Sequence, residues 1–417
     1  MKNNVTRRLL VVGAGIGQVH LVKKARSQGI HVTVLTLPGP YPCIELADDV
    51  IYCDVFDREK AAAEAKARGI DAVVSDQNDL MVPTVAYIAE KLGLPGNSFA
   101  QAQSYCDKNV FRANCDRVGV PAPKHVEVLS PDFDPSTFDA PLQWIVKPGV
   151  QQSSVGVKRI DSLDELRPAL DFAIKKSFNG KAILEEFFIG KELVCEGFIE
   201  NGEFRLLGFS DCFYLDMKDM LIRGSMFFPS RVKPEIMERI VGYEKKMAAF
   251  TRPNFSILYS EYLVNETTDE IRVVESALRG SAMYASSHLI PYSTGIDIND
   301  VLLKKALGEP VDVAAAFASR KDAAAGYISF YLREGTIVSV AGLDEIKSFD
   351  FVKEVFLDDI KAGATVEKFA HKGSRKGPIL IVGKDRDELE RNAACVKETL
   401  KVEVQDTTGA VSGASWE

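Results

Sequence analysis

The sequence has no long hydrophobic run and no sign of a secretory leader. Its longest apolar stretches, such as residues 9–16, are far shorter than the roughly 20 residues that a membrane span needs. The N-terminal segment leads into a short apolar strand and a glycine loop, without the cleavage site of a signal peptide. The net charge of −8 argues against nucleic acid as the main partner. We therefore expect a cytoplasmic protein whose partners are neither membranes nor nucleic acids.

Two common site motifs are also absent. The seven cysteines are odd in number and scattered, and they include no Cys-x-x-Cys pair. This usage favours reduced thiols and gives no zinc motif. No Gly-x-x-x-x-Gly-Lys-Ser/Thr segment occurs, so a P-loop is excluded. The 417 residues are too many for one ordinary core, and we expect two to four domains.

Residues 1 to about 105 alternate short apolar strands with helical segments, which predicts a parallel sheet with crossover helices. Gly13, Gly15 and Gly17 follow the first strand. Their spacing is not the dinucleotide-binding Gly-x-Gly-x-x-Gly, and the second strand ends without an acidic residue, so a tight turn is favoured over NAD or FAD binding. Asp76 and Asp79 follow a later strand. They are either ligand contacts or turn and N-cap residues, and the second interpretation is favoured.

Residues 260–280 form two β-rich runs around a polar hexapeptide, which is typical of a hairpin. Folding this hairpin about Thr268 places Glu261 roughly opposite Glu275, where side chains lie about 5 Å apart on one face. Two facing carboxylates repel and call for a cation, a shared proton or a basic neighbour. Arg279 follows at the end of the second strand. These groups suit a Mg²⁺-bound polyphosphate, although a solvated hairpin with charges on its wet face is the alternative.

Two lysines lie upstream of this hairpin. Lys108 begins a helical segment, and Lys147 ends a strand that leads into the Gly/Ser-rich turn of residues 149–157. Such a turn exposes backbone N–H groups with little obstruction and can close over phosphates. A plain hairpin turn is the alternative.

The segment Glu-Glu-Phe-Phe-Ile-Gly-Lys-Glu, residues 185–192, joins two strands. A strand edge can offer an N–H and a C=O to the edge of an adenine ring, as it does to peptides. Nearby carboxylates can accept from the adenine amino group and the ribose hydroxyls. A surface strand with alternating charges is the alternative.

The order of these motifs resembles the ATP-grasp superfamily, in its branch of carboxylate–amine ligases that includes amino-acid ligases and biotin-carboxylase-like enzymes. The resemblance covers about residues 8–310 and rests on the combination of motifs. It implies mixed α/β and α+β architecture. A pre-ATP-grasp, Rossmann-like parallel-sheet domain (residues 1–105) would precede a two-lobed ATP-grasp domain (106–305) whose lid covers about residues 120–185. The strand and helix pattern of residues 306–405 predicts a small C-terminal α+β subdomain.

The resemblance also implies which residues bind ATP. They are Lys108, Lys147, Ser153, Ser154, Gly156, Glu185, Glu186, Phe188 and Glu192. The two lysines would bind the phosphates, and the loop residues would cover them. Glu185 and the backbone around Glu186 and Phe188 would take the adenine, and Glu192 would take the ribose.

For the reacting end, the resemblance implies that Glu261 and Glu275 bind Mg²⁺, with Mn²⁺ as a substitute. Arg279 would steady an acyl phosphate, and Lys147 would also stabilise charge. Many relatives carry an Asn as a third metal ligand where this chain has Ala277, and many carry a His where it has Ser260. The metal shell would then need phosphate and water to complete it, or would hold one ion less firmly.

Two further segments carry expectations. Residues 211–231 are expected to form a loop between strands, with Lys218, Arg223 and Ser225 either near the acid or acceptor substrate or on an ordinary surface excursion. Residues 406–417, rich in Gly, Ser and Thr, are expected to form a flexible tail.

These observations favour an ADP-forming ligase. It would activate a small carboxylate, with an amino acid as the first expectation, as an acyl phosphate and join it to an amine. A bicarbonate-activating carboxylase or an enzyme like carbamoyl-phosphate synthase is the runner-up. A non-catalytic ATP-binding regulatory protein is the alternative from another class, favoured only by Ala277. The resemblance further leads us to expect a homodimer.

Overall fold

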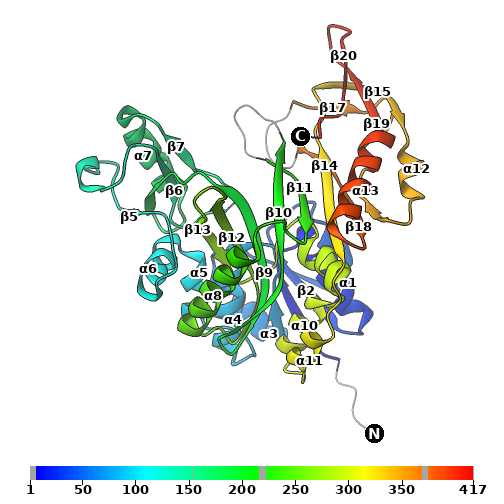
Figure 1. Cartoon of the computed structure of the whole chain (residues 1–417). Coiled ribbons are helices and arrows are strands. Elements are labelled where there is room, and N and C mark those ends of the chain that lie inside the picture. Colours follow the sequence, from blue (N-terminus) through cyan, green and yellow to red (C-terminus); the bar gives the residue numbers. More distant parts are fainter. Residues whose placement is uncertain (1–5, 153, 216–221, 369–373, 417) are drawn as a thin grey trace. The chain divides into compact units, whose positions relative to one another are not determined.

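The computed structural model describes residues 6–152, 154–215, 222–368 and 374–416 (Figure 1). The chain divides into two compact units. The first unit comprises Met1–Leu207, Lys233–Ala282 and Ile298–Val313, and the second comprises Gly208–Val232, Met283–Asp297 and Ala314–Glu417. Each unit therefore contains segments that are distant in sequence, which the expected boundaries at residues 105 and 305 did not anticipate.

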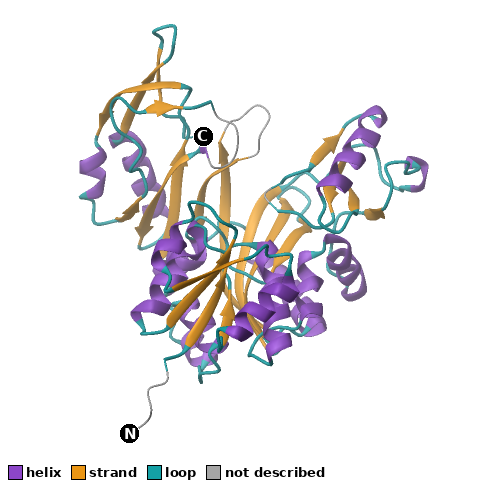
Figure 2. Cartoon of the chain, turned by 180° about the vertical axis from the view of Figure 1, so that it is seen from behind, coloured by secondary structure: helices purple, strands orange, loops and turns teal. Residues whose placement is uncertain are grey.

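The N-terminal part of the first unit is the expected parallel α/β layer. Its strands pair in the order β3-β2-β1-β4, and helices pack on the sheet (Figures 1 and 2). Apolar residues of the strands and of two helices share one core. The elements are β1 (Arg8–Val12), α1 (Val19–Ser27), β2 (His31–Thr36), α2 (Pro42–Leu46), β3 (Asp49–Tyr52), α3 (Arg58–Ala67), β4 (Ala72–Val74) and α4 (Val82–Leu92).

The first unit has a second, antiparallel sheet at residues 125–186, and its role as a lid stays a prediction. Its order is β5-β8-β6-β7, and α7 packs on its apolar face. Two helices connect it to the N-terminal layer. The elements are α5 (Phe99–Cys106), α6 (Lys108–Val118), β5 (His125–Val128), β6 (Trp144–Pro148), β7 (Lys158–Ile160), α7 (Leu166–Lys176) and β8 (Ala182–Glu186).

The predicted hairpin forms the paired strands β12 and β13 of the first unit, and β12 also pairs with β9. Glu261 pairs directly with Glu275, so the expected register is confirmed. The elements are β9 (Lys191–Glu200), α8 (Pro234–Thr251), β12 (Phe255–Asn265), β13 (Glu270–Ala277) and α10 (Ile298–Ala306).

The second unit contains the strand order β10-β11-β14-β18-β16 and a small sheet in the order β17-β15-β19-β20. Apolar residues of both sheets and of two helices, α12 and α13, belong to its core. The strands are β10 (Glu203–Leu215), β11 (Ile222–Phe228), β14 (Ala324–Phe330), β15 (Gly335–Ala341), β16 (Val352–Val355), β17 (Thr365–Val366), β18 (Lys376–Gly383), β19 (Lys401–Gln405) and β20 (Val411–Gly413). The helices are α9 (Ile290–Thr294), α11 (Val313–Ala318), α12 (Leu343–Lys347) and α13 (Arg386–Thr399).

Two expectations about the second unit were wrong. Residues 406–416 are not a flexible tail, because β20 pairs with β19 and the Trp416 ring packs 4.6 Å from the Phe330 ring. A strand edge and an aromatic contact thus fix a segment whose composition is typical of a linker. Residues 211–231 are not a plain loop either, since Asp211 pairs with Phe227 across β10 and β11. Lys218 lies outside the described residues, whereas Arg223 and Ser225 belong to β11.

Within the described ranges, we find no helix with both the length and the apolar character that crossing a bilayer would require.

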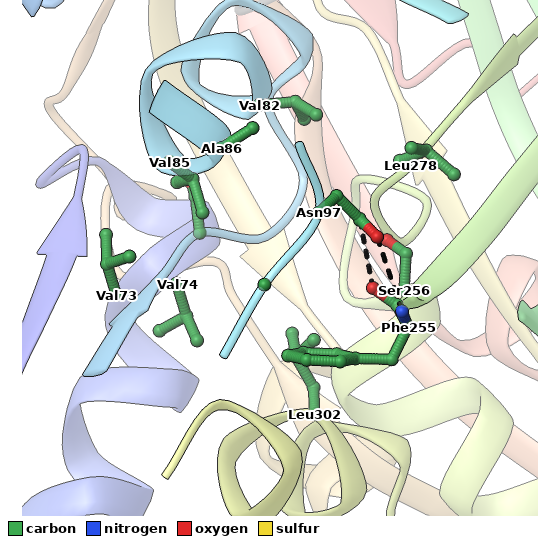
Figure 3. A pocket seen from close by; sticks show the side chains of 12 residues that line it. Val73, Val74, Val82, Val85, Ala86, Asn97, Phe255, Ser256, Leu278 and Leu302 are labelled. Atoms are coloured by element: carbon green, nitrogen blue, oxygen red, sulfur yellow. Dashed lines mark hydrogen bonds between the residues drawn. The ribbon is translucent and has the colours of Figure 1, made fainter. Parts of the chain in front are cut away.

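A small apolar cavity of about 40 Å³ lies inside the first unit (Figure 3). Val74, Ala86, Phe255 and Leu302 are among the residues that line it, and Asn97 closes one side through hydrogen bonds with the Phe255 backbone. Ligand pockets for drug-sized molecules measure about 300–1,000 Å³. The cavity is therefore a packing gap between the N-terminal layer and β12 and not a substrate site.

A buried carboxyl on α8 makes stability depend on pH. Glu244 is buried and accepts a hydrogen bond of 2.7 Å from the Tyr262 hydroxyl. Burial outweighs the hydrogen bonds from Ser260 and Tyr262 and raises the pKa of Glu244 from 4.5 to about 7. The folded chain therefore keeps this proton where the unfolded chain has lost it, and stability falls as pH rises from 4.5 to about 7.

Glu244→Gln should remove this pH dependence. The neutral amide can still accept from Tyr262 and has no proton to lose. Relative to the wild type, we expect the variant to gain melting temperature between pH 5 and pH 8, with the free energy difference on the order of 3 kcal/mol. Thermal unfolding of both proteins across this range measures the effect. Parallel pH profiles for the two would contradict the assignment.

Candidate active site

The carboxylates of the β12–β13 hairpin face each other on one side of the sheet. Glu261 and Glu275 are both half-buried, and the Tyr259 hydroxyl donates a hydrogen bond to Glu261. Burial and the nearby charge of Glu261 raise the pKa of Glu275. The raised pKa shows that the two carboxylates repel each other. Two neighbouring carboxylates of this kind are suitable ligands for a hard divalent cation such as Mg²⁺.

This donor set is small. Among the described residues, no cluster of three or more His, Cys, Asp or Glu side chains is arranged to hold a metal ion. Ala277, buried on β13, contributes no ligand atom. A cation held by Glu261 and Glu275 would therefore need further oxygens from phosphate and water.

Arg279 follows this pair in the sequence, and its guanidinium forms a bidentate ion pair with Asp79. Its Nε and Nη2 atoms donate to the two Asp79 oxygens at 2.9 and 3.0 Å, and Nη1 donates to the Gly280 carbonyl at 3.1 Å. Burial alone would lower the pKa of Arg279, but Asp79 outweighs it and raises this pKa. Conversely, burial would raise the pKa of Asp79, and Arg279 lowers it. Three of the five N–H groups of the guanidinium are thus used, which leaves two for a ligand.

Asp76 fixes the same segment from the N-terminal layer. It is buried and accepts from the Gly280 backbone N–H at 2.8 Å and from Asn299 Nδ2 at 3.0 Å. The interpretation of Asp76 and Asp79 as turn and cap residues is incomplete. Asp76 does accept from the adjacent Gln77 N–H, but both aspartates also bind the Arg279–Gly280 segment. These pairs span about 200 residues, so local sequence carried no signal for them.

Lys108 links the hairpin carboxylates to the Gly/Ser-rich loop. Its Nζ donates to the Gln151 carbonyl at 3.0 Å, and its charge lowers the pKa of Glu275 against the larger effects of burial and Glu261. The Asp107 carboxylate caps the helix that begins at Lys108 by accepting from the Asn109 N–H. Lys108 therefore connects the start of α6, the Gly/Ser-rich loop and the pair Glu261 and Glu275.

The Gly/Ser-rich loop contains two left-handed backbone positions. Most backbone N–H groups of its described residues donate to acceptors of the chain itself, so their use for phosphate stays a prediction. Ser154 is exposed and has a φ of 59°, and Gly156 has a φ of 79°. A Cβ on Gly156 would come within 2.8 Å of Pro148, so this position requires glycine. Ser153 lies outside the described residues.

A buried ion cluster joins α6 to the sheet β5-β8-β6-β7. Glu185, with 0% exposure, binds Arg112 Nε through Oε1 at 2.6 Å and Lys147 Nζ through Oε2 at 2.6 Å. Burial would raise the pKa of Glu185, but the two cations outweigh it and lower this pKa to about 2. The Glu185 carboxylate has no exposed surface and holds Lys147 in place, and its expected contact with adenine stays a prediction. Arg112 was missed, since an arginine within a helical segment gives no signal of burial.

The remaining predicted nucleotide residues lie at the junction of β8 and β9. Arg272 forms an ion pair with Glu186 at 3.6 Å and lies over the Phe188 ring at 4.9 Å. Glu192 pairs with Leu263 across β9 and β12. Their roles toward adenine and ribose stay predictions.

One buried acid near Arg279 was also missed. Glu196 on β9 is 0% exposed, and the backbone N–H and the hydroxyl of Ser281 act on its carboxylate. Burial raises its pKa to about 8, against the opposing effect of Arg279. A glutamate inside the apolar run Leu-Val-Cys-Glu-Gly-Phe, residues 193–198, was the available signal.

Comparison with known proteins matches three family descriptions along the chain. "ATP-grasp N-terminal domain" matches residues 22–96, "D-ala D-ala ligase C-terminus" matches residues 117–249, and "L-amino acid ligase C-terminal domain 2" matches residues 329–405. All three describe parts of ATP-grasp ligases, in the chain order of the sheets described above. The chain belongs to the ATP-grasp superfamily.

Curated relatives of this ATP-grasp protein are ligases. A D-alanine–D-alanine ligase of Hydrogenovibrio crunogenus is 32% identical over 115 residues, which are 27% of this chain and 36% of the relative. An alanine–anticapsin ligase of Bacillus subtilis is 26% identical over 197 residues, 43% of this chain and 40% of the relative. The chain thus spans well under half the length of these two relatives.

Solved structures share the fold over nearly the whole ATP-grasp chain. An L-amino acid ligase from Bacillus licheniformis has a TM-score of 0.78 at 22% identity and covers 96% of this chain and 99% of its own. A phosphoribosylglycinamide synthetase from Anaerococcus prevotii has a TM-score of 0.77 at 18% identity, covering 96% and 100%. The mixed α/β ATP-grasp architecture predicted from the motifs is confirmed.

Proposed function

We propose that the protein is a Mg²⁺–ATP-dependent ligase that activates a small carboxylate, most simply an amino acid, and joins it to an amine. Its products are an amide or peptide bond, ADP and phosphate. The observation that carries the proposal is the meeting of the carboxylate pair Glu261 and Glu275 with Arg279 and Lys108 inside one compact unit. The names of the curated relatives, which are carboxylate–amine ligases, support the same chemistry.

In the first step, a carboxylate oxygen of the substrate would attack the γ-phosphorus of ATP, and ADP would leave. The acyl phosphate formed is attacked at its carbonyl carbon by the amine, phosphate leaves, and the nitrogen loses a proton. Mg²⁺, when bound at Glu261 and Glu275, supplies neutralisation of phosphate charge.

The chain's own residues position charge in this scheme. Lys108, and Lys147 held by Glu185, would bind phosphate oxygens, and the loop with Ser154 and Gly156 would cover them. Arg279 would direct its two remaining N–H groups at the acyl phosphate, because Asp79 fixes the guanidinium plane. Catalysis of this kind consists of orientation and electrostatic stabilisation, with little covalent work by the protein.

A second candidate for the acid substrate is bicarbonate. The fold matches a 2-oxoglutarate carboxylase biotin carboxylase domain, solved with MgADP and bicarbonate, with a TM-score of 0.74 at 15% identity. Arg279 suits either acid, since a guanidinium fork binds any planar carboxylate. The substrate screen therefore includes bicarbonate.

A phosphate-release screen tests the proposal. Purified protein with Mg²⁺–ATP is offered single amino acids, pairs of amino acids, short dicarboxylates and bicarbonate with an amine. We expect release only when both an acid and an amine are present. Thermal stabilisation by Mg²⁺–ATP with no turnover for any pair would instead support the non-catalytic ATP-binding alternative.

Two attributes of the proposed enzyme stay predictions. The seven cysteines are free thiols, which supports a cytoplasmic location. A homodimer rests on the resemblance alone, and light scattering of the purified chain would measure it.

A further inference from the structure

Tyr259 touches both charged ends of the candidate site. It lies on β12 with 3% exposure, and its hydroxyl donates to Glu261. The Arg279 guanidinium carbon lies 4.2 Å from the centre of the Tyr259 ring. A carboxylate of the proposed metal pair and the proposed acyl-phosphate arginine are therefore held by one side chain.

The strand geometry explains why this side chain reaches both groups. Residues two apart on a strand point to the same face, so Tyr259 and Glu261 share the face of the site. Tyr259 also pairs directly with Ala277 across β12 and β13. Directly opposed side chains lie about 5 Å apart. The methyl group of Ala277 offers no ligand atom.

Three contacts then fix Arg279. Asp79 holds the guanidinium edge, the Gly280 carbonyl accepts from Nη1, and the Tyr259 ring covers one face. A cation over an aromatic face gains about 0.5–2 kcal/mol, more when it is desolvated. The hydroxyl of the same ring acts on Glu261, because an accepted hydrogen bond orients the carboxylate.

We propose that Tyr259 is a positioning residue that orients Glu261 for a divalent cation and fixes Arg279 beside it, in place of the ligand atom that Ala277 lacks. The proposal rests on the proposed function, since it needs a cation at Glu261 and Glu275. A purely structural role is the competing explanation: a buried tyrosine needs an acceptor for its hydroxyl, and any acceptor would serve.

Tyr262 provides a matched control on the same strand. It is equally buried, and its hydroxyl also donates to a carboxylate, that of Glu244. Glu244 belongs to α8 and is not one of the two proposed cation ligands. Tyr259→Phe and Tyr262→Phe each remove one buried hydroxyl and keep the ring, so only the partner carboxylate distinguishes them.

Mn²⁺ binding to the full-length chain in the presence of ADP, followed by electron paramagnetic resonance, tests the proposal without relying on activity. Tyr259→Phe should weaken Mn²⁺ binding by about 10-fold or more, the usual effect of losing a residue that orients a ligand. Tyr262→Phe should bind Mn²⁺ like the wild type. Equal Mn²⁺ affinity of Tyr259→Phe and the wild type would overturn the proposal. A wild-type chain that binds no Mn²⁺ with ADP would contradict the proposed function itself.

A second variant tests the compensation for Ala277. Adding Ala277→Asn to Tyr259→Phe supplies a ligand oxygen on the opposing strand. We expect the double variant to recover most of the lost Mn²⁺ affinity. A double variant that binds Mn²⁺ no better than Tyr259→Phe would show that the hydroxyl does not stand in for that oxygen. Thermal unfolding of each variant confirms that the comparison uses folded chains.

Discussion

Glu275→Gln should lower ADP formation at least 100-fold while leaving the chain as stable as the wild type or more so. The metal supplies several kcal/mol of charge stabilisation in such reactions, and each 1.36 kcal/mol is a factor of ten in rate. The gain in stability follows from the raised pKa of Glu275, because the amide removes the repulsion from Glu261. A loss of activity together with a gain in stability would indicate that this carboxylate serves to bind the metal and not to stabilise the fold.

A coupled assay of ADP formation with saturating substrates measures the first effect, and thermal unfolding without metal measures the second. Glu266→Gln is the control, since Glu266 is exposed in the turn of the same hairpin. It should leave both quantities unchanged. Wild-type ADP formation by Glu275→Gln would refute the metal assignment.

Glu185→Gln should destabilise the first unit by about 3–5 kcal/mol. The substitution leaves Arg112 and Lys147 buried without a counter-charge, and breaking a buried ion cluster by removing one partner costs about this much. The pKa of Glu185, lowered to about 2, also sets the pH range. The stabilisation is present above pH 4.5 and is lost as pH falls through 2, so the variant should differ most from the wild type at neutral pH.

Urea unfolding at pH 7 measures this loss. Glu127→Gln is the matched control, because Glu127 on β5, the strand paired with β8, forms an exposed ion pair with Lys181 at 3.0 Å. Exposed pairs contribute about 0–1 kcal/mol, so the control should unfold close to the wild type. Similar urea midpoints for Glu185→Gln and Glu127→Gln would show that the buried cluster is not the stabilising feature.

The sequence was informative wherever a local pattern decided the structure. The alternation of polar and apolar residues in 260–280 set the hairpin register, so Glu261 and Glu275 could be paired in advance. The strand-and-helix alternation of the first hundred residues likewise predicted the parallel sheet. In both cases the type of each element is set by a pattern within one short segment of sequence.

The contacts that were missed join residues far apart. Arg112 meets Glu185 across 73 positions, and Asp79 meets Arg279 across 200. The periodicity of polar and apolar residues cannot predict such a pair, because the two partners lie in different segments, each with its own pattern. The error at residues 406–416 has the same origin. The prediction used the composition of the segment alone, whereas the pairing of β20 with β19 depends on tertiary structure.

The clamp of Asp76 and Asp79 on the Arg279–Gly280 segment has a consequence for synthesis on the ribosome. The N-terminal layer emerges first, and domains generally fold in that order. Its two aspartates lack these long-range partners until residues 279, 280 and 299 have been translated. A nascent chain stalled before residue 279 would therefore carry a folded N-terminal sheet whose two aspartates have not yet met Arg279, Gly280 and Asn299. The candidate site would be assembled only late in translation.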